Sequence, residues 1–498
     1  MVSRNEVAKA AWHGMIWRFL ERCSSQVVSF IVSIILARLL LPEQYGIIAM
    51  TMIFIALSEV FVTSGLGSAL IQRSKYDELE FSTMFWASLL FSFLLYALLF
   101  LAAPGISLLM KVPALTIVLR VLGLRLPISA MNSIQQAYVS QQMIFKKFFF
   151  STLSGTVFSG IIGLFMAYQG LGVWALVGQN ISMVVINTVV LHFLIPWRPA
   201  LSFSKTAFQR LYGFSWRLMA SSFMGTLFEQ LRSFLIGRYY SPADLAFANR
   251  GEQFPMVISN NVSASVQSVL FPAFSHLKEN QESVRHAVQK AMIIGSFVIC
   301  GLMSILAGIS DTLVTVILTE KWLDCIPYLQ WSCLGQCFGI LSMINLQTIS
   351  ALGRADIVLK LEFVKKPFWF IILLIGVQFS PLAVIAGNAL YGIISFTLNS
   401  IPNRKLLKYG VGQQIKDIIG PFFISGLLFF ILQKLQVLLP RTFLFLIIEG
   451  FLGMVGYFFI GRMFRINGAE YVYAFIRERI KNVRRKLGQV KRNLKSFS

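Results

Sequence analysis

Charged residues are scarce in this chain of 498 residues, where Asp, Glu, Lys and Arg make up only 13%. A soluble globular domain usually carries about a quarter. Acids are the scarcer kind, because 21 Asp and Glu stand against 44 Lys and Arg and leave a net charge of +23. Hydrophobic residues reach 56%. This composition excludes a soluble globular protein and predicts a membrane protein.

Cysteine and histidine are also rare, with five and four residues, which argues against a disulfide framework. The chain has no HExxH, no GxSxG and no phosphate-binding Gly-Lys loop, so the motifs of the commonest hydrolases and nucleotide-binding proteins are missing. Cys333 and Cys337 lie one helical turn apart, but no third ligand is near them in the sequence, so we interpret them as packing residues. We expect no enzyme activity, no metal and no cofactor.

Long stretches contain no charged residue at all and nearly reach the ~20 residues that span a bilayer. Reading them against Pro, Gly and charge predicts about fourteen transmembrane helices. The spans lie near 14–39, 45–69, 81–103, 114–140, 148–168, 172–195, 211–237, 243–272, 287–309, 327–352, 361–379, 381–402, 417–437 and 440–461. The predicted fold class is an all-α polytopic membrane protein.

Most Lys and Arg fall in alternate connections between these spans, as the positive-inside rule requires of cytoplasmic loops. This pattern predicts that the N- and C-termini are both cytoplasmic. The net charge therefore reflects topology. The basic C-terminal tail fits anionic lipid headgroups better than nucleic acid, because no aromatic residues interleave it for base stacking.

A stretch near the N-terminus returns about 200 residues later, which indicates two half-domains of similar design. Arg38 and Pro42 match Arg238 and Pro242, and the pattern GxxWR at 14–18 recurs at 213–217. Both copies enter the bilayer in the same direction, so we expect two parallel six-helix lobes related by a pseudo-two-fold axis along the membrane normal. The predicted domains are an N-lobe at 1–200, a C-lobe at 201–410, two added helices at 411–462 and a basic cytoplasmic tail at 463–498.

Seven arginines fall inside predicted spans, where a guanidinium must face water, a protein partner or an anion. They predict a cationic cavity that suits a phosphate group. These candidate substrate-binding residues are Arg18, Arg22, Arg120, Arg125, Arg217, Arg232 and Arg250. The alternative is that they reach the membrane interface or form structural ion pairs with Glu21, Glu59, Glu229 and Glu252.

Acids inside the spans are candidates for coupling transport to a proton or sodium gradient, because a carboxylate can change protonation as a cavity opens and closes. Glu229, Glu252 and Glu21 are the predicted ion-coupling residues. Glu449 lies in the added pair of helices, and we interpret it as a packed or interfacial residue.

Several motifs together resemble the polysaccharide transporter flippases (Wzx-type, similar to colanic acid exporters) of the multidrug/oligosaccharidyl-lipid/polysaccharide exporter superfamily. The resemblance covers residues 10–410, and GLGVWALV at 170–177 is its most specific string. The other motifs lie at 36–46, 65–73, 197–199, 236–238, 320–322 and 351–354. One departure is Gln141, which stands where the family usually has an arginine ahead of Phe145 and Lys146.

The resemblance implies a flippase that exports undecaprenyl-pyrophosphate-linked oligosaccharide repeat units for exopolysaccharide, capsule or O-antigen synthesis. It implies alternating access of two lobes around a cationic cavity in the bacterial inner membrane, with membrane lipids, a polysaccharide polymerase and glycosyltransferases as partners. We expect a monomer that acts as an antiporter and binds no nucleic acid. The alternatives are a multidrug or lipid-precursor exporter on the same scaffold, a membrane polymerase or ligase, and an assembly partner in polysaccharide synthesis.

Overall fold

The computed structural model describes residues 4–63, 66–71, 77–277, 280–474 and 477–478. All regular structure in this part of the chain is helical, which confirms the all-α prediction. The predicted cytoplasmic tail lies outside the described residues from 479 onward, as do the basic residues at 73 and 75.

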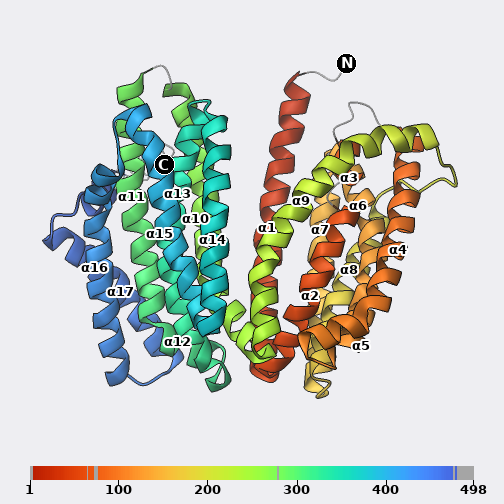
Figure 1. Cartoon of the computed structure of the whole chain (residues 1–498), viewed down its shortest axis with the longest axis horizontal. Helices are drawn as coiled ribbons and strands as arrows, with labels where there is room; N and C mark the ends of the chain where they lie inside the picture. Colours follow the sequence, from red (N-terminus) through yellow and green to blue (C-terminus); the bar gives the residue numbers. More distant parts are fainter. Residues whose placement is uncertain (1–3, 64–65, 72–76, 278–279, 475–476, 479–498) are drawn as a thin grey trace, which may run out of the picture. The chain divides into compact units, whose positions relative to one another are not determined.

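The first nine helices occupy the N-terminal half of the chain (Figure 1). Their bounds are α1 Arg4–Leu39, α2 Pro42–Thr63, α3 Leu66–Ile71, α4 Glu78–Met110, α5 Leu115–Gly123, α6 Arg125–Gln141, α7 Phe145–Tyr168, α8 Val173–Leu194 and α9 Lys205–Tyr239. Eight α-helices and one short 3-10 helix (η1) follow. Their bounds are α10 Pro242–Leu277, α11 Gln281–Gly308, α12 Ser310–Ile317, η1 Glu320–Cys325, α13 Ile326–Ala351, α14 Ala355–Phe379, α15 Pro381–Leu407, α16 Val411–Leu438 and α17 Phe443–Met463.

Ten helical segments in the described part of the chain are long and apolar enough to cross a bilayer, with α5 and α6 counting together as one. Each of the other predicted spans also falls on a helix. These four helices, α9, α10, α13 and α14, are 25 to 36 residues long but more polar. The polytopic membrane class is therefore confirmed, and the count of fourteen stays a prediction.

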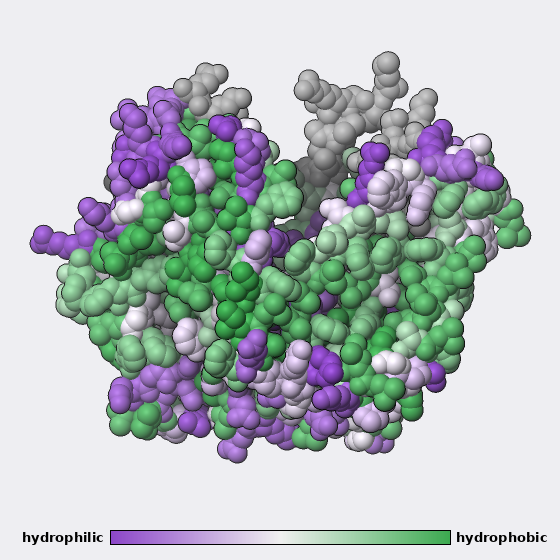
Figure 2. Space-filling model, viewed as in Figure 1, coloured by the Kyte–Doolittle hydropathy of each residue, from purple (hydrophilic) through white to green (hydrophobic). Residues whose placement is uncertain are grey.

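The chain forms two compact units, unit 1 at 1–246 and unit 2 at 247–498. Helix α9, which the predicted boundaries assign to the C-lobe, packs on α2, α3 and α4 within unit 1. The lobe boundaries themselves stay a prediction. In each unit, hydrophobic residues cover the middle of the visible face and hydrophilic residues gather at its two ends, as expected for helices that cross a bilayer (Figure 2).

The two copies of the repeated motif form the same local structure. In the first copy α1 ends at Leu39 and α2 begins at Pro42, and in the second α9 ends at Tyr239 and α10 begins at Pro242. Proline suits the first helical position, because its missing N–H would have no intrahelical partner there. The matched prolines therefore fix where the second helix of each pair begins.

In both copies, the start of the second helix (α2 or α10) is capped by the residue at the same position of the repeat. Gln44 Oε1 accepts a hydrogen bond from the Leu41 backbone N–H at 3.1 Å, and Asp244 Oδ2 accepts one from the Ser241 N–H at 3.0 Å. In the second copy the Ser241 hydroxyl also accepts from the Asp244 N–H at 3.1 Å, which completes a capping box. This equivalence supports duplication of the helix pair.

Gly46 of α2 lies directly against the backbone of Pro242 in unit 1. A Cβ atom at Gly46 would stand 1.8 Å from the Pro242 carbonyl oxygen, so the backbone would have to move. We expect Gly46→Ala to destabilise the purified protein by about 1–3 kcal/mol or more, as overpacking of a tight contact does. Thermal unfolding in detergent would measure the loss. The control is Gly105→Ala in α4, where nothing lies within 4 Å, and equal melting temperatures for both variants would contradict the prediction.

Candidate functional site

A polar cavity of about 490 Å³ lies within unit 1, between α1, α2, α3, α6 and α8. Two arginines and one glutamate line it, so its charged residues carry a net positive charge. The lining residues are Arg18, Glu59, Thr63, Gly67, Ile71, Arg125, Ser129, Asn132, Ser133, Gln136, Ala137, Ser140, Met183, Val184 and Asn187. We refer to this space as the polar cavity.

Arg125 of α6 is the central cation of the polar cavity. Its Nε donates a hydrogen bond to Glu59 Oε1 at 3.0 Å, and its Nη1 donates to Asn180 Oδ1 at 3.4 Å. The same Glu59 oxygen accepts from the Ser129 hydroxyl at 2.8 Å. The other N–H groups of Arg125 have no hydrogen-bond partner among the described residues, and the side chain is 21% exposed. These donors remain available to an anion in the cavity.

A break in the predicted span at 114–140 places Arg125 at the start of a helix. The structure divides this span at Leu124 into α5 and α6. Pro127 explains the division, because proline has no N–H to donate to the carbonyl of Gly123 four residues earlier. Arg125 therefore heads α6, with Ser129 one turn behind it.

Arg18 of α1 lines the same cavity, held by aromatic rings and an acid. Its guanidinium carbon lies 4.0 Å from the ring centre of Phe148 and 5.0 Å from that of Phe145, both on α7. Its Nη1 lies 3.6 Å from Glu21 Oε2. Cation–π contacts and an ion pair fix the arginine without using all of its donors. The alternative of structural ion pairs thus holds for Arg18 and Arg125, although both also line the cavity.

Hydroxyl and amide groups make up most of the remaining polar lining. They follow one face of α6 at the helical spacing of three or four residues, from Ser129 through Asn132, Ser133 and Gln136 to Ser140. Such groups both donate and accept hydrogen bonds, as sugar hydroxyls require. Neither this stripe nor the Asn180 contact is among the residues predicted from the sequence. The stripe has a readable periodicity, whereas no sequence signal indicates Asn180.

Other candidate arginines lie elsewhere in unit 1. Arg120 packs over the Phe100 ring at 4.3 Å and donates from Nε to the Phe100 carbonyl at 3.3 Å. Arg22 and Arg217 are exposed on α1 and α9, and Arg232 is half-buried on α9. The candidate coupling residue Glu229 is exposed on α9, whereas Glu21 pairs with Arg18 as described above. Substrate binding or coupling by these residues stays a prediction.

Arg250 and Glu252 lie in unit 2 and are buried, with 7% and 8% of their surface exposed. Arg250 Nη1 donates to Gln253 Oε1 at 2.6 Å, and its guanidinium lies 5.1 Å from the Trp322 ring centre. Their neighbour Gly251 approaches the backbone of Cys325 closely, which fixes α10 against η1. The surroundings of Arg250 are therefore those of a packed residue.

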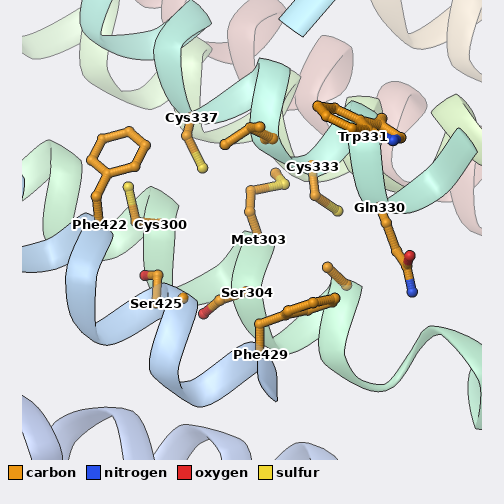
Figure 3. A pocket seen from close by; sticks show the side chains of 13 residues that line it. Cys300, Met303, Ser304, Gln330, Trp331, Cys333, Cys337, Phe422, Ser425 and Phe429 are labelled. Atoms are coloured by element: carbon orange, nitrogen blue, oxygen red, sulfur yellow. The ribbon is translucent and has the colours of Figure 1, made fainter. Parts of the chain in front are cut away.

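Unit 2 contains an apolar cavity of about 400 Å³ between α11, α13 and α16 (Figure 3). Cys300, Cys333 and Cys337 line it together with Met303 and aromatic rings of α16. Among the described residues no group of three or more His, Cys, Asp or Glu is placed to hold a metal ion. The thiols act here as small apolar packing groups.

A fully buried amide network joins α13, α15 and α16 in the same unit. Asn345 donates to Gln414 Oε1 at 2.9 Å and to the Ser400 hydroxyl at 3.0 Å, and its own oxygen accepts from Asn403 at 2.6 Å. All four residues are 0% exposed. Such a network fixes one arrangement of three helices, because shifting any of them leaves buried polar groups unpaired.

Residues 35–327, more than half of the chain, match the family model described as polysaccharide biosynthesis protein. The chain belongs to this family. It is 23% identical over 323 residues to the succinoglycan biosynthesis transport protein ExoT of Rhizobium meliloti (strain 1021), and this match spans 65% of each chain. It is also 23% identical over 403 residues to the lipopolysaccharide biosynthesis protein WzxC of Escherichia coli (strain K12), with 78% of this chain and 80% of WzxC covered.

A solved structure of the lipid II flippase MurJ, in an inward closed conformation, has the same fold. The TM-score is 0.71 at 15% sequence identity, with 90% of this chain and 98% of MurJ covered. The family resemblance inferred from the sequence motifs is therefore confirmed. The fold of this polysaccharide biosynthesis protein is shared with a membrane transporter.

Proposed function

We propose that this chain is a flippase that moves polyprenyl-pyrophosphate-linked oligosaccharide repeat units across the bacterial inner membrane. The observation that carries the proposal is the polar cavity, which holds arginines and neutral polar groups inside a unit built from apolar helices. Membership of the polysaccharide biosynthesis family supports it. The similarity to ExoT, a succinoglycan biosynthesis transport protein, and the fold shared with MurJ, a lipid II flippase, agree with it.

Different residues of the polar cavity bind different parts of the substrate. The pyrophosphate binds to Arg125 and Arg18, because guanidinium groups bind phosphate through paired donors. The hydroxyl and amide stripe of α6 hydrogen-bonds the sugars. The polyprenyl tail stays in the lipid, where its apolar surface costs nothing to expose. The protein thus shields only the polar part of the substrate.

The remaining features of the transporter follow the sequence predictions. The chain crosses the membrane about fourteen times with both termini in the cytoplasm, as the distribution of Lys and Arg indicates. Two parallel six-helix lobes alternate access to the two sides, and the protein acts as a monomer. A polysaccharide polymerase and glycosyltransferases consume and supply its substrate. The protein performs no bond-making chemistry of its own, so it is a transporter and not an enzyme.

Reconstitution into liposomes tests the proposal. A labelled undecaprenyl-pyrophosphate oligosaccharide is placed in the outer leaflet, and a membrane-impermeant lectin or glycosidase reports how much sugar remains accessible. Wild-type protein is expected to move the sugar to the inner leaflet, while protein-free liposomes keep it outside. Equal accessibility with and without the protein would contradict the proposal, and transport of a cationic drug instead would favour the multidrug alternative.

A further inference from the structure

Helix α17 buries a single carboxyl group in a helix that is otherwise almost wholly apolar. Glu449 is 1% exposed, whereas the only other charged residue of α17 is Arg462 in its last turn. Taking an ionised carboxylate out of water without a cation costs several kcal/mol or more, of the order seen for buried charges. Glu449 is therefore either paired with a cation or neutral.

The side chains that lie within hydrogen-bonding reach of the Glu449 carboxyl are both uncharged, Thr312 and Gln436. The Thr312 hydroxyl of α12 donates to Glu449 Oε1 at 3.2 Å. Glu449 Oε2 is buried and has no hydrogen-bond partner among the described residues. The Gln436 side chain of α16 is 6% exposed and lies next to the carboxyl, close enough for at most a long hydrogen bond to it. The buried carboxyl thus has uncharged hydrogen-bonding neighbours and no cation beside it among the described residues.

Three helices pack on α17, and the charged groups that they present do not neutralise a carboxylate. Helix α12 contributes another acid, Asp311, which is half-buried and accepts weakly from Gln433 of α16 at 3.5 Å. Lys434 of α16 is exposed. Helix α11 presents its last turns, where Gly308 and Ile305 lie against Leu432 and Gly453, while Arg285 and Lys290 lie in its first half.

Close packing encloses the carboxyl. A Cβ atom at Gly308 would stand 2.8 Å from Leu432, and one at Gly453, one turn after Glu449, would stand 3.2 Å from Leu432 and from Ile305. The helices α11, α16 and α17 therefore fit together at van der Waals distance. Asp311 and Gln433, both half-buried, are hydrogen-bonded to each other, and Asp311 is a charged neighbour of the carboxyl.

We propose that Glu449 is a proton-binding site. While α17 is packed on α11, α12 and α16, a proton from water forms an O–H bond with Glu449 Oε2. When the helices separate and water reaches the group, that O–H bond breaks and the proton returns to water, leaving the carboxylate. The use of this exchange to couple transport to a proton gradient rests on the proposed flippase function, whereas the site itself does not.

Infrared spectroscopy of the whole purified protein in lipid nanodiscs tests the site directly. Wild-type protein at neutral pH is expected to show the carbonyl stretch of a protonated carboxylic acid. Glu449→Gln should remove that band, and the matched control Glu470→Gln, at an exposed acid, should retain it. Absence of the band from the wild type, its persistence in Glu449→Gln, or its appearance only after removal of sodium would overturn the proposal.

A second variant keeps the test decisive if Glu449→Gln does not fold. Thr312→Val removes the hydroxyl that donates to Glu449 Oε1, so the carbonyl band should shift to higher frequency in this variant. An unshifted band would overturn its assignment to Glu449. In liposomes, transport by Glu449→Gln should lose its stimulation by an imposed proton gradient, and full stimulation would overturn the coupling role. If wild-type protein moves no glycan, the flippase proposal fails while the infrared result still decides the site.

Discussion

Arg125→Glu is expected to abolish movement of the lipid-linked glycan while leaving membrane insertion intact. The new carboxylate would face Glu59, whose oxygen now accepts from Arg125 Nε at 3.0 Å, and would repel the substrate's pyrophosphate. Arg125→Gln keeps much of the side-chain length and should reduce the transport rate about 10–100-fold, since a hydrogen bond to a charged group contributes about 1.5–3 kcal/mol. The liposome assay measures both rates, with the amount of folded protein equalised by gel filtration.

Arg120→Glu is the matched control, because it reverses the same charge five residues earlier in the chain. Arg120 lies on Phe100 and does not line the polar cavity. If the polar cavity alone binds the pyrophosphate, this variant should transport at close to the wild-type rate, whereas a selective loss in Arg120→Glu would support the sequence prediction that Arg120 binds substrate. Equal loss of transport in both variants would show that the overall positive charge matters and not the position of Arg125. It would then exclude Arg125 as a specific substrate-binding residue. Wild-type transport by Arg125→Glu would exclude the polar cavity as the pyrophosphate site.

The sequence was sufficient to predict the long helices and the duplicated helix pair, but not the short helices α3, α12 and η1. Charge-free runs locate spans because lipid tolerates few charges, and Pro42 and Pro242 set helix starts by a local rule that needs no tertiary information. The division between α5 and α6 was also available from Pro127. Hydropathy alone does not show this division, because it is continuous across the predicted span at 114–140. The backbone hydrogen bonds of the helix are nevertheless interrupted before Pro127.

The site was only partly predictable, because helix rotation is set by packing and not by position along the span. Arg120 and Arg125 belong to one predicted span, yet only Arg125 lines the polar cavity. Arg250 has the intramembrane position expected of a substrate ligand but is buried against Trp322. The spacing of basic residues along the sequence indicates which side chains can share one face of a helix. What that face contacts depends on how the neighbouring helices pack against it.

Two buried charged residues also show that position along the sequence does not reveal what surrounds a side chain. Lys365 falls near the start of the predicted span at 361–379, and the structure places it within α14 with 3% of its side chain exposed, paired with Glu362 at 2.5 Å. Glu449 was interpreted as a packed or interfacial acid. The structure confirms that it is packed, and its burial among uncharged hydrogen-bonding neighbours, which no sequence pattern reveals, is what makes proton binding a testable idea.

Trp197→Ala is expected to destabilise unit 1 by about 3–5 kcal/mol, the usual cost of deleting a large buried aromatic side chain. Trp197 belongs to the connection between α8 and α9 and is 5% exposed. Its ring stacks on Tyr138 at 6.2 Å and meets Phe81 and Phe85 edge-on at 6.0 and 5.9 Å. Loss of the ring would leave a cavity where α4 and α6 meet this connection.

Hydrogen bonds show why this loss should spread beyond the cavity. The same connection is attached to α4 by the Trp86 Nε1, which donates to the Ala200 carbonyl at 2.8 Å, and by the Ala200 N–H, which donates to the Ser82 hydroxyl at 3.0 Å. Once Trp197 is removed, these bonds must hold the start of α9 without the aromatic cluster. Thermal unfolding should therefore occur at a clearly lower temperature, while Trp174→Ala, at a side chain that is 37% exposed, should cost much less. Equal losses would mean that the cluster does not stabilise this junction and that the tryptophan of the motif at 197–199 serves another purpose.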